Sequence, residues 1–507
     1  MPSSAAAPPG PSLFDRPPHP RRDGAPSREE FAVTVPVPEA VRFEHDMLGD
    51  APVPASAYYG IHTQRAVENF PISGTILADC PDLIRALAAI KQAAALANTE
   101  LGLLDERRCG AIVAACEEIR AGALHDQFVV DLIQGGAGTS TNMNANEVIA
   151  NRALEILGYT RGAYEHLHPN EHVNMGQSTN DVYPTALKIA AIGAIRRLTV
   201  AMASLRGSFE AKAVEFADIL KMGRTQLQDA VPMTLGQEFG TYARMLGEDE
   251  ARLGEAELLI REINMGATAI GTGINAHPLY AAIVCRQLSR LTGIPLVTAE
   301  DLIEATQDCG AFVQVSGVLK RVAVKLSKTC NDLRLLSSGP RAGFNEINLP
   351  ARQAGSSIMP GKVNPVIPEV VNQVAFEVIG NDVTISFAAE AGQLQLNAFE
   401  PVIAYSLFRS LAHLEAACRT LDVNCVRGIT ANRERLRASV EQSIGLVTAL
   451  NPYIGYRNAT AVAVEAHATG RGVYDLVLEK GLMGRAQLDA VLKPERLTRP
   501  QAFAPVA

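Results

Sequence analysis

The sequence has no excess of positive charge and no long hydrophobic run. Its formal net charge is −8 at pH 7, which argues against nucleic acid or an anionic membrane surface as the main partner. No apolar stretch approaches the roughly 20 residues that a membrane-spanning helix needs. We therefore expect neither a nucleic-acid nor a membrane partner. Local positive groups must hold any anionic substrate, because the overall field does not attract it.

The chain also lacks the cysteine patterns of metal and redox sites. None of its eight cysteines forms a CxxC pair, and no Cys/His cluster has the spacing of zinc ligands. Cys109 and Cys116 are seven residues apart, as are Cys418 and Cys425, and this spacing is typical of a buried helix stripe. These features predict reduced core thiols in a cytoplasmic protein with no intrinsic metal or organic cofactor.

The first 36 residues have few large apolar groups and are rich in Pro, Ala, Ser and Arg. This composition predicts a disordered extension over residues 1–36. A signal peptide is disfavoured because the apolar core is missing. Acidic residues such as Asp15 and Glu29 count against the alternative of an organelle transit peptide.

From about Arg42 onward the hydrophobic periodicity is mainly helical, and neither an alternating strand–helix pattern nor a solenoid repeat is present. Long helical stretches are predicted over 184–220, 230–262, 299–337, 365–390 and 397–423. Short strands are expected near 31–36 and 127–133. Five long helices favour an elongated bundle. Their apolar residues lie on more than one face, which indicates burial against other subunits.

The most informative segment is the Ser356 loop, residues 355–365, with the sequence GSSIMPGKVNP. Its Asn-Pro end predicts a helix start capped by Asn364, which would place Lys362 beside the positive end of a helix dipole. A nucleotide-binding phosphate loop is the rival interpretation. We reject it because five residues, not four, separate its glycines, and Val363 stands where a Ser or Thr should hold magnesium.

Three further polar segments are flanked by glycine: the Thr139 segment (135–144), the Ser178 segment (176–181) and the Thr225 segment (223–229). In the first, Asn144 and Glu147 have the spacing of a capping box. Taken singly, each segment is most simply a helix cap. Taken together with the Ser356 loop, three of the four place hydroxyls and amides at helix starts. If they converge, they could hold both carboxylates of a four-carbon diacid.

All four segments resemble, in the same order, the matching regions of the aspartase/fumarase superfamily, and the resemblance extends from about Arg42 to the C-terminus. It implies a mainly α, three-domain fold with a central five-helix bundle. It also implies a homotetramer with a twenty-helix core, in which three subunits share each active site. The expected divisions are an N-terminal helical domain (37–178), a central helix bundle (179–430) and a small C-terminal helical domain (431–507).

The resemblance also implies roles for residues in the four segments. The carried-over positions are Ser356 as the catalytic base and, as substrate-binding residues, Thr139, Ser178, Thr179, Asn180, Thr225, Gln226, Lys362 and Asn364. Ser356 would remove a proton from the carbon beside one carboxylate. Lys362 and Asn364 would stabilise the resulting aci-carboxylate, and the group on the adjacent carbon would leave. Hydrolytic nucleophilic catalysis at Ser356 is the rival, but no motif with a base and an acidic orienter surrounds it.

The leaving group is indicated by finer resemblances. Residues 42–46, 58–63, 366–374 and 392–397 resemble aspartases more than fumarases, which implies deamination of L-aspartate to fumarate and ammonia. Gln226 replaces a histidine found in fumarases and some aspartases, so this position hydrogen-bonds without titrating. The alternatives are a fumarate hydratase and a non-catalytic relative used as a structural or binding protein. Whether a divalent cation such as Mg²⁺ activates the enzyme stays open.

A secondary anion site at His168 and Asn170 is also implied by the resemblance. His168 and His172 are four residues apart, a spacing that can bind metal on a helix, but Pro169 makes a loop the better prediction. An ordinary surface histidine is the alternative.

Overall fold

The computed structural model describes residues 40–500. The chain divides into the units Met1–Ala40 and Val41–Ala507, and every element below belongs to the second unit. The predicted disordered extension (1–36) and the strand expected near 31–36 lie outside the described residues.

The second unit is mainly helical, with short two-stranded sheets. The strands are β1 (Val41–Asp46), β2 (Gly49–Pro54), β3 (Leu220–Thr225), β4 (Gln228–Thr234), β5 (Glu262–Ile263), β6 (Val297–Thr298), β7 (Ile347–Asn348) and β8 (Thr430–Ala431). The helices before the bundle are α1 (Ile61–Asn69), α2 (Pro81–Glu100), α3 (Glu106–Arg120) and α4 (Thr139–Ile156). The remaining helices are α5 (Thr179–Glu215), α6 (Leu235–Leu259), α7 (Tyr280–Thr292), α8 (Leu302–Gln307), α9 (Gly310–Leu336), α10 (Val366–Glu390), α11 (Glu400–Asn424), α12 (Arg433–Gln442), α13 (Val447–Ile454), α14 (Tyr456–Thr469), α15 (Val473–Glu479), α16 (Arg485–Val491) and α17 (Pro494–Leu497).

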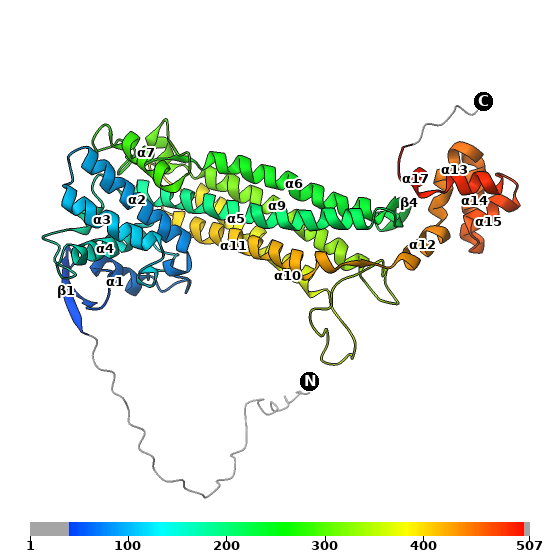
Figure 1. The fold of residues 1–507 in the computed structure, drawn as a ribbon, viewed down its shortest axis with the longest axis horizontal. Helices are drawn as coiled ribbons and strands as arrows, with labels where there is room; N and C mark the ends of the chain where they lie inside the picture. The colour runs from blue at the N-terminus through cyan, green and yellow to red at the C-terminus, as the bar shows by residue number, and fades with distance from the viewer. Residues whose placement is uncertain (1–39, 501–507) are drawn as a thin grey trace, which may run out of the picture. The chain divides into compact units, whose positions relative to one another are not determined.

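Five long helices form the predicted central bundle. Helices α5, α6, α9, α10 and α11 lie side by side in Figure 1. Each packs against the next in this order, and α11 also packs against α5. Their inward residues join the largest apolar core, together with α2, α3 and α4. The α2 residues Leu83, Leu87, Ile90, Ala94 and Ala97 are buried within it. The fold class is therefore confirmed as mainly α with a five-helix bundle.

The first bundle helix extends back from the predicted 184–220 stretch to the Ser178 segment, because Pro184 is accommodated inside it. A proline lacks the N–H that would bond to the carbonyl four residues before it. The freed Asn180 carbonyl instead accepts a hydrogen bond from the Asn264 side chain at 3.0 Å. Helix α5 thus starts at Thr179 and ends at Glu215, where the chain turns into β3.

Two other predicted elements differ from the structure. The 299–337 stretch is divided into α8 and α9, because the Asp308 carboxylate accepts from the Gly310 backbone N–H at 2.9 Å and turns the chain between them. The strand expected near 127–133 is wrong: only an isolated bridge joins Asp131 to Ile76. The strand pair β3–β4 was not predicted. Its second strand occupies the beginning of the stretch assigned to a helix from residue 230.

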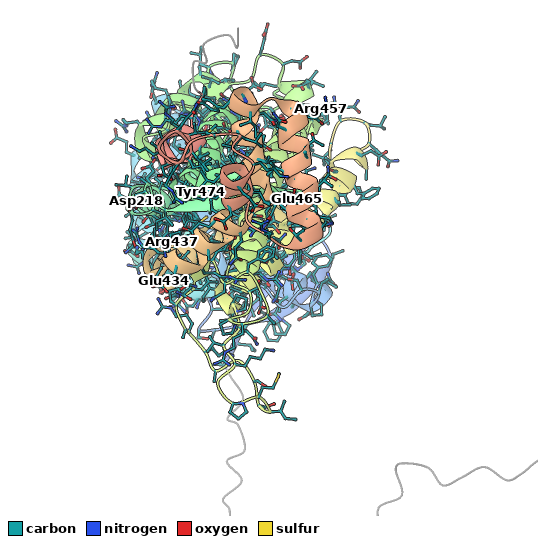
Figure 2. The ribbon with its side chains drawn as sticks, turned by 90° about the vertical axis from the view of Figure 1, so that its right-hand side faces the viewer. Asp218, Glu434, Arg437, Arg457, Glu465 and Tyr474 are labelled. Carbon is teal, nitrogen blue, oxygen red and sulfur yellow. The ribbon has the colours of Figure 1, made fainter. Side chains whose placement is uncertain are left out.

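The segment after the bundle has an apolar cluster of its own, formed by α12–α16 with Met222 of β3. An ion pair between Arg433 of α12 and Asp218 (2.9 Å) attaches this segment to the turn before β3. Figure 2 shows Glu434 and Arg437 on α12, and Tyr474 on α15 beyond it. The domain boundaries predicted near residues 178 and 430 stay predictions.

All eight cysteines are free thiols, and all but Cys80 are buried. The two pairs that are seven residues apart, Cys109/Cys116 and Cys418/Cys425, are buried as their spacing predicted. None of the helices in the described range combines the length and the apolar character needed to cross a bilayer.

We expect Gly236→Ala to destabilise the bundle. Gly236 lies in the first turn of α6, and a Cβ there would approach the Ala213 carbonyl oxygen to 2.4 Å and the Ala217 backbone to 2.7 Å. Backbone atoms cannot move aside without disturbing the helix, so we expect a loss of about 1–3 kcal/mol in the free energy of unfolding.

Gly254→Ala in the same helix is the matched control, because its Cβ would meet nothing within 4 Å. That control should be neutral or stabilising by up to about 1 kcal/mol. Equal denaturation midpoints for the two variants would contradict the close α5–α6 contact.

Candidate functional site

The Thr139 segment supplies the N-terminus of α4. Gly138 is its N-cap in a left-handed conformation (φ +90°), and a Cβ at this position would lie 2.4 Å from the Tyr183 ring of α5. Only glycine satisfies both demands. The Thr139 hydroxyl donates to the Gly136 carbonyl at 2.8 Å. The capping box predicted at Asn144 and Glu147 is wrong, since both residues lie inside α4.

The Ser178 segment starts α5, as predicted. The Ser178 hydroxyl accepts from the Asn180 backbone N–H (3.3 Å), and the Ser178 backbone N–H donates to the Asp181 carboxylate (2.9 Å). Asp181 is fully buried and also accepts from the N–H groups of Gly266 (3.1 Å) and Thr268 (3.0 Å). Burial raises the pKa of Asp181 to about 6, although these donors oppose the shift. The cap therefore holds the 264–269 turn against the start of α5.

A buried lysine that sequence reasoning missed lies beneath both helix starts. Lys91 of α2 donates to the side-chain oxygens of Asn142 (2.7 Å), Asn174 (2.8 Å) and Gln177 (2.9 Å). Its complete burial lowers its pKa to about 7. The Asn142 side chain in turn donates to the Thr179 hydroxyl at 3.2 Å. The available signal was that Lys91 is the only charged residue between Arg85 and Glu100.

The structure thus brings four predicted residues, Thr139, Ser178, Thr179 and Asn180, to the adjoining N-termini of α4 and α5. The Asn180 side chain is directed to the Ala269 carbonyl, to which it donates at 2.7 Å. Two helix N-termini side by side concentrate unpaired N–H groups and partial positive charge. This corner of the molecule is therefore suited to bind a carboxylate.

Thr225 and Gln226 do not start a helix. They lie at the tip of the β3–β4 hairpin, where Thr225 pairs with Gln228. Gln226 (φ +54°) and Leu227 (φ +63°) form the two-residue turn, a conformation that glycine and asparagine usually supply. All three of Thr225, Gln226 and Leu227 are exposed in the single chain.

The Ser356 loop is closed at its base by its own backbone. The Gly355 N–H donates to the Lys362 carbonyl (2.8 Å), and the Asn364 side chain donates to the Gly355 carbonyl (2.8 Å). Asn364 is thus not the N-cap of α10: that position is Pro365, and the helix begins at Val366. Within the loop the backbone N–H groups of Ile358 (3.1 Å) and Met359 (2.9 Å) donate to the Ser356 hydroxyl oxygen.

The two halves of the candidate site lie at opposite ends of one helix. Ser178 precedes the first residue of α5, and the hairpin carrying Thr225 follows its last. At 1.5 Å per residue, the 37 residues of α5 span about 55 Å. The buried ion pairs between Glu346 and the residues Lys221 and Arg224 place the root of the Ser356 loop at the hairpin end. The four segments therefore do not converge within a single chain.

His168 and His172 do not form a metal site together. The Nδ1 atom of His168 accepts from the Asn170 (3.1 Å) and Glu171 (3.4 Å) backbone N–H groups, and His172 Nδ1 accepts from the His168 N–H (2.8 Å). Both nitrogens thus stabilise the single π-helical turn of Pro169–Val173, where a loop was predicted. Asn170 is exposed at this turn. Within the part of the chain that the structure describes, no group of three or more His, Cys, Asp or Glu side chains is arranged to hold a metal ion.

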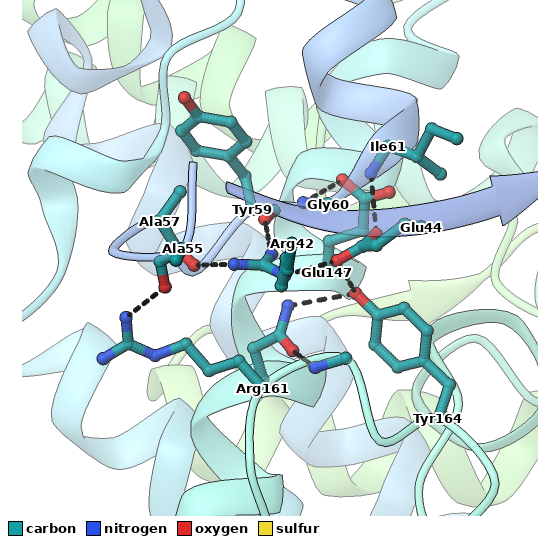
Figure 3. Close-up of polar contacts among 12 residues, drawn as sticks. Arg42, Glu44, Ala55, Ala57, Tyr59, Gly60, Ile61, Glu147, Arg161 and Tyr164 are labelled. Atoms are coloured by element: carbon teal, nitrogen blue, oxygen red, sulfur yellow. Dashed lines mark hydrogen bonds and ion pairs between the residues drawn. The ribbon is translucent and has the colours of Figure 1, made fainter. Parts of the chain in front are cut away.

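Glu147 has a structural role that the sequence did not reveal. This buried carboxylate of α4 accepts from the backbone N–H groups of Gly60 (2.8 Å), His62 (2.9 Å) and Thr63 (3.1 Å) at the start of α1. Figure 3 shows Glu147 beside Glu44, which accepts from the Ile61 N–H at 2.9 Å. Two carboxylates from distant elements thus cap α1 and fix it to the helix that carries Thr139.

Comparisons with known proteins identify the family of the chain. Residues 49–380 match the family model described as lyase, and residues 446–499 match the model of the fumarase C C-terminus. The chain belongs to the aspartase/fumarase superfamily. The resemblance inferred from the four polar segments is therefore confirmed, as is the prediction of a lyase fold.

Among curated superfamily members, an aspartate ammonia-lyase of Pseudomonas fluorescens is 61% identical, over 91% of this chain and 96% of its own length. That of Helicobacter pylori is 58% identical, over 91% of this chain and 99% of its own. In solved structures, a fumarate lyase:delta crystallin of Brucella melitensis bound to cobalt is 56% identical, with a TM-score of 0.89 over 91% of this chain and all of that one. A class II fumarase of Schistosoma mansoni has a TM-score of 0.87 at 35% identity, with the same coverage.

The buried Glu147 predicts a pH-dependent stability. Burial raises its pKa from 4.5 to about 7. The folded state then holds its proton more tightly than the unfolded state, so this group lowers the free energy of unfolding as pH rises from about 4.5 to 7. Glu147→Gln removes that contribution. The stability difference, variant minus wild type, should grow with pH across this window by at most about 1.4 kcal/mol per unit. Urea unfolding followed by circular dichroism at fixed protein concentration measures it.

The control for this experiment is Glu106→Gln, because Glu106 is exposed in the first turn of α3. Its pH dependence should follow that of the wild type. If the Glu147→Gln curve also ran parallel to the wild type, the carboxyl would not titrate in this range.

Proposed function

We propose that this lyase deaminates L-aspartate reversibly to fumarate and ammonia. The observation that carries the proposal is the run of relatives named aspartate ammonia-lyase, which are 56–61% identical to the chain over 91% of its length. The fumarase with a similar fold is only 35% identical. The shared fold is therefore compatible with either leaving group, and the sequence identity favours ammonia.

Ser356 is the proposed base, and the loop geometry supports this role. A free hydroxyl is too weak an acid to ionise at neutral pH, so its oxygen needs preorganised donors. The two N–H groups of Ile358 and Met359 point at the Ser356 oxygen and favour its alkoxide form. In the proposed reaction Ser356 takes the proton beside one carboxylate, and the negative charge moves into that carboxylate.

Lys362 and Asn364 would stabilise the dianionic intermediate, since Lys362 supplies charge next to a loop whose base Asn364 closes. Thr139, Ser178, Thr179 and Asn180 would bind the amino group and the second carboxylate at the paired helix starts. Thr225 and Gln226 would complete the carboxylate contacts. The electron pair of the broken C–N bond leaves with ammonia, and the double bond of fumarate remains.

The substrate must be enclosed by more than one chain, because the two groups of residues lie about 55 Å apart along α5. We propose a homotetramer with a twenty-helix core and three subunits at each site. An exposed apolar stripe on α10 supports this assembly: Phe376 is 61% exposed, Val383 50% and Phe387 69%. Their spacing of seven and four residues places them on one helix face.

The proposed chemistry uses only side chains and backbone groups of this protein, and no step requires a metal or organic cofactor. Activation by a divalent cation such as Mg²⁺, a secondary anion site at His168 and Asn170, and a cytoplasmic location are further parts of the proposal. Eight free thiols support the location, since such thiols persist in a reducing compartment.

The decisive experiment compares L-aspartate with L-malate. We expect purified protein to release fumarate, followed by its ultraviolet absorbance, from L-aspartate at least about 100-fold faster than from L-malate.

Ser356→Ala should reduce the aspartate rate by at least about a thousandfold while leaving the circular dichroism spectrum and the oligomer size unchanged. Ser357→Ala is the matched control and should retain activity. Faster turnover of malate would make the enzyme a fumarate hydratase, and an active Ser356→Ala variant would refute the assigned base.

Shared sites predict complementation between two inactive variants. Ser356→Ala and Ser178→Ala change opposite ends of α5, so a mixed tetramer can contain sites in which both residues are intact. If chains assemble at random in equal amounts, about a quarter of the sites should be complete. Co-expressed and co-purified variants should therefore regain about a quarter of the wild-type activity.

Ser356→Ala co-expressed with Lys362→Ala is the control, because both residues belong to one loop and would enter a site together. Absence of recovery in the first pair, with mixed tetramers verified by mass spectrometry, would contradict sharing.

A further inference from the structure

Beneath the hairpin that carries Thr225 and Gln226 lies a buried cluster of charges that the proposed chemistry does not use. Lys221 of β3 is 2% exposed, and Glu346 is 1% exposed. Their side chains form an ion pair of 2.9 Å, and Arg224 contacts the other oxygen of Glu346 at 2.6 Å. Glu238 of α6 reaches Lys221 at 2.5 Å. Glu346 is thus one carboxylate shared by two cations of the same strand.

A bulge in the hairpin lies between the two cations. Residues three apart on a regular strand point to opposite faces. The register of β3 against β4 shifts between Met222 and Arg224, where β4 carries one extra residue, and the added twist of such a bulge lets Lys221 and Arg224 both reach Glu346. Gly223 lies opposite the bulge, where a Cβ would come within 2.9 Å of the Val231 carbonyl oxygen. The local backbone is therefore shaped to present both cations to Glu346.

Glu346 is also fixed from the side of the Ser356 loop. Its N–H donates to the Leu336 carbonyl (2.8 Å) at the end of α9, and its carbonyl accepts from the Asn432 N–H (2.9 Å). The next residue starts β7, which pairs with β8. Farther along, Arg352 donates to the carbonyls of Val423 and Asn424 at the end of α11. Strand β7 and the segment held by Arg352 lead directly into Gly355 and Ser356.

We propose that Glu346 is a positioning residue that fixes the substrate-contacting hairpin relative to the root of the loop carrying the base. The inference rests on the proposed function. A two-stranded hairpin has little stability of its own, so its tip is only as well placed as its attachment. A buried ion cluster is seldom a net source of stability, but it defines geometry sharply, because removing one partner leaves a charge unpaired. Arg224 adds to this definition by stacking on Phe344, 4.2 Å from the ring centroid.

The test compares Glu346→Gln with a matched variant at another shared carboxylate. Asp249 of α6 is 1% exposed and bridges two cations of α9, Arg321 (2.8 Å) and Lys325 (2.9 Å), midway along the bundle. Asp249→Asn therefore removes an equivalent buried charge far from the candidate site residues. Both variants should lower the melting temperature. Only Glu346→Gln should change catalysis per folded tetramer.

For Glu346→Gln we expect kcat with L-aspartate to fall by about ten- to a hundredfold, because a small misplacement of reacting groups has effects of that size. KM should rise as well, since the hairpin contacts the substrate carboxylate. Hydrogen exchange should increase within 223–228 and 353–363. For Asp249→Asn we expect kcat and KM within about twofold of the wild type and no change of exchange in these segments.

Three outcomes separate the possibilities. A wild-type enzyme that does not deaminate L-aspartate overturns the proposed function itself. An active wild type whose Glu346→Gln variant keeps kcat and KM within twofold overturns the positioning role. A proportional loss of folded protein and activity in both variants assigns Glu346 a purely structural role. If Glu346→Gln does not fold, Arg224→Gln, which alters the more exposed partner, replaces it and should show the same effects at smaller size.

Discussion

The length of a single helix determines how this protein can work. Helix α5 carries the Ser178 cap at one end and leads into the Thr225 hairpin at the other, about 55 Å away. The bundle to which it belongs is closely packed, with each of its five helices against at least two others. A four-carbon substrate cannot contact both ends of one chain. In the proposed tetramer, the packed scaffold that separates the polar segments within one chain would hold each of them in place where neighbouring bundles meet.

Much of the fold and the chemistry could be predicted from local patterns. The Ser178 cap of α5 was predictable because Ser178, Asn180 and Asp181, which form it, lie within four residues of each other. The helix periodicity located the five bundle helices, although the stretch predicted over 299–337 contains two helices. The Ser356 loop was singled out by its composition, and its proposed role follows from the resemblance. These features share one property: their physical cause is contained in a short stretch of sequence.

The predictions that failed have causes that lie outside a short stretch of sequence. Glu147 was assigned to a local cap, but its partners Gly60, His62 and Thr63 lie more than 80 residues earlier in the chain. Asn364 was predicted as an N-cap, and its side chain instead closes the loop onto Gly355. The turn at Gln226 and Leu227 lacks the glycine or asparagine that usually marks a two-residue hairpin. In each case a tertiary contact or an unusual backbone conformation outweighed the local preference.

The exposed tip of the Ser356 loop has a consequence for how the enzyme must be handled. Ile358 is 83% exposed and Val363 52% exposed in the single chain, on the loop that carries the hydroxyl proposed for proton abstraction. An ionised alcohol survives only where water is excluded. If the proposed tetramer excludes that water, dilution that separates its subunits would extinguish turnover while every helix stayed folded. The lifetime of activity in storage should then depend on protein concentration more steeply than the lifetime of the fold.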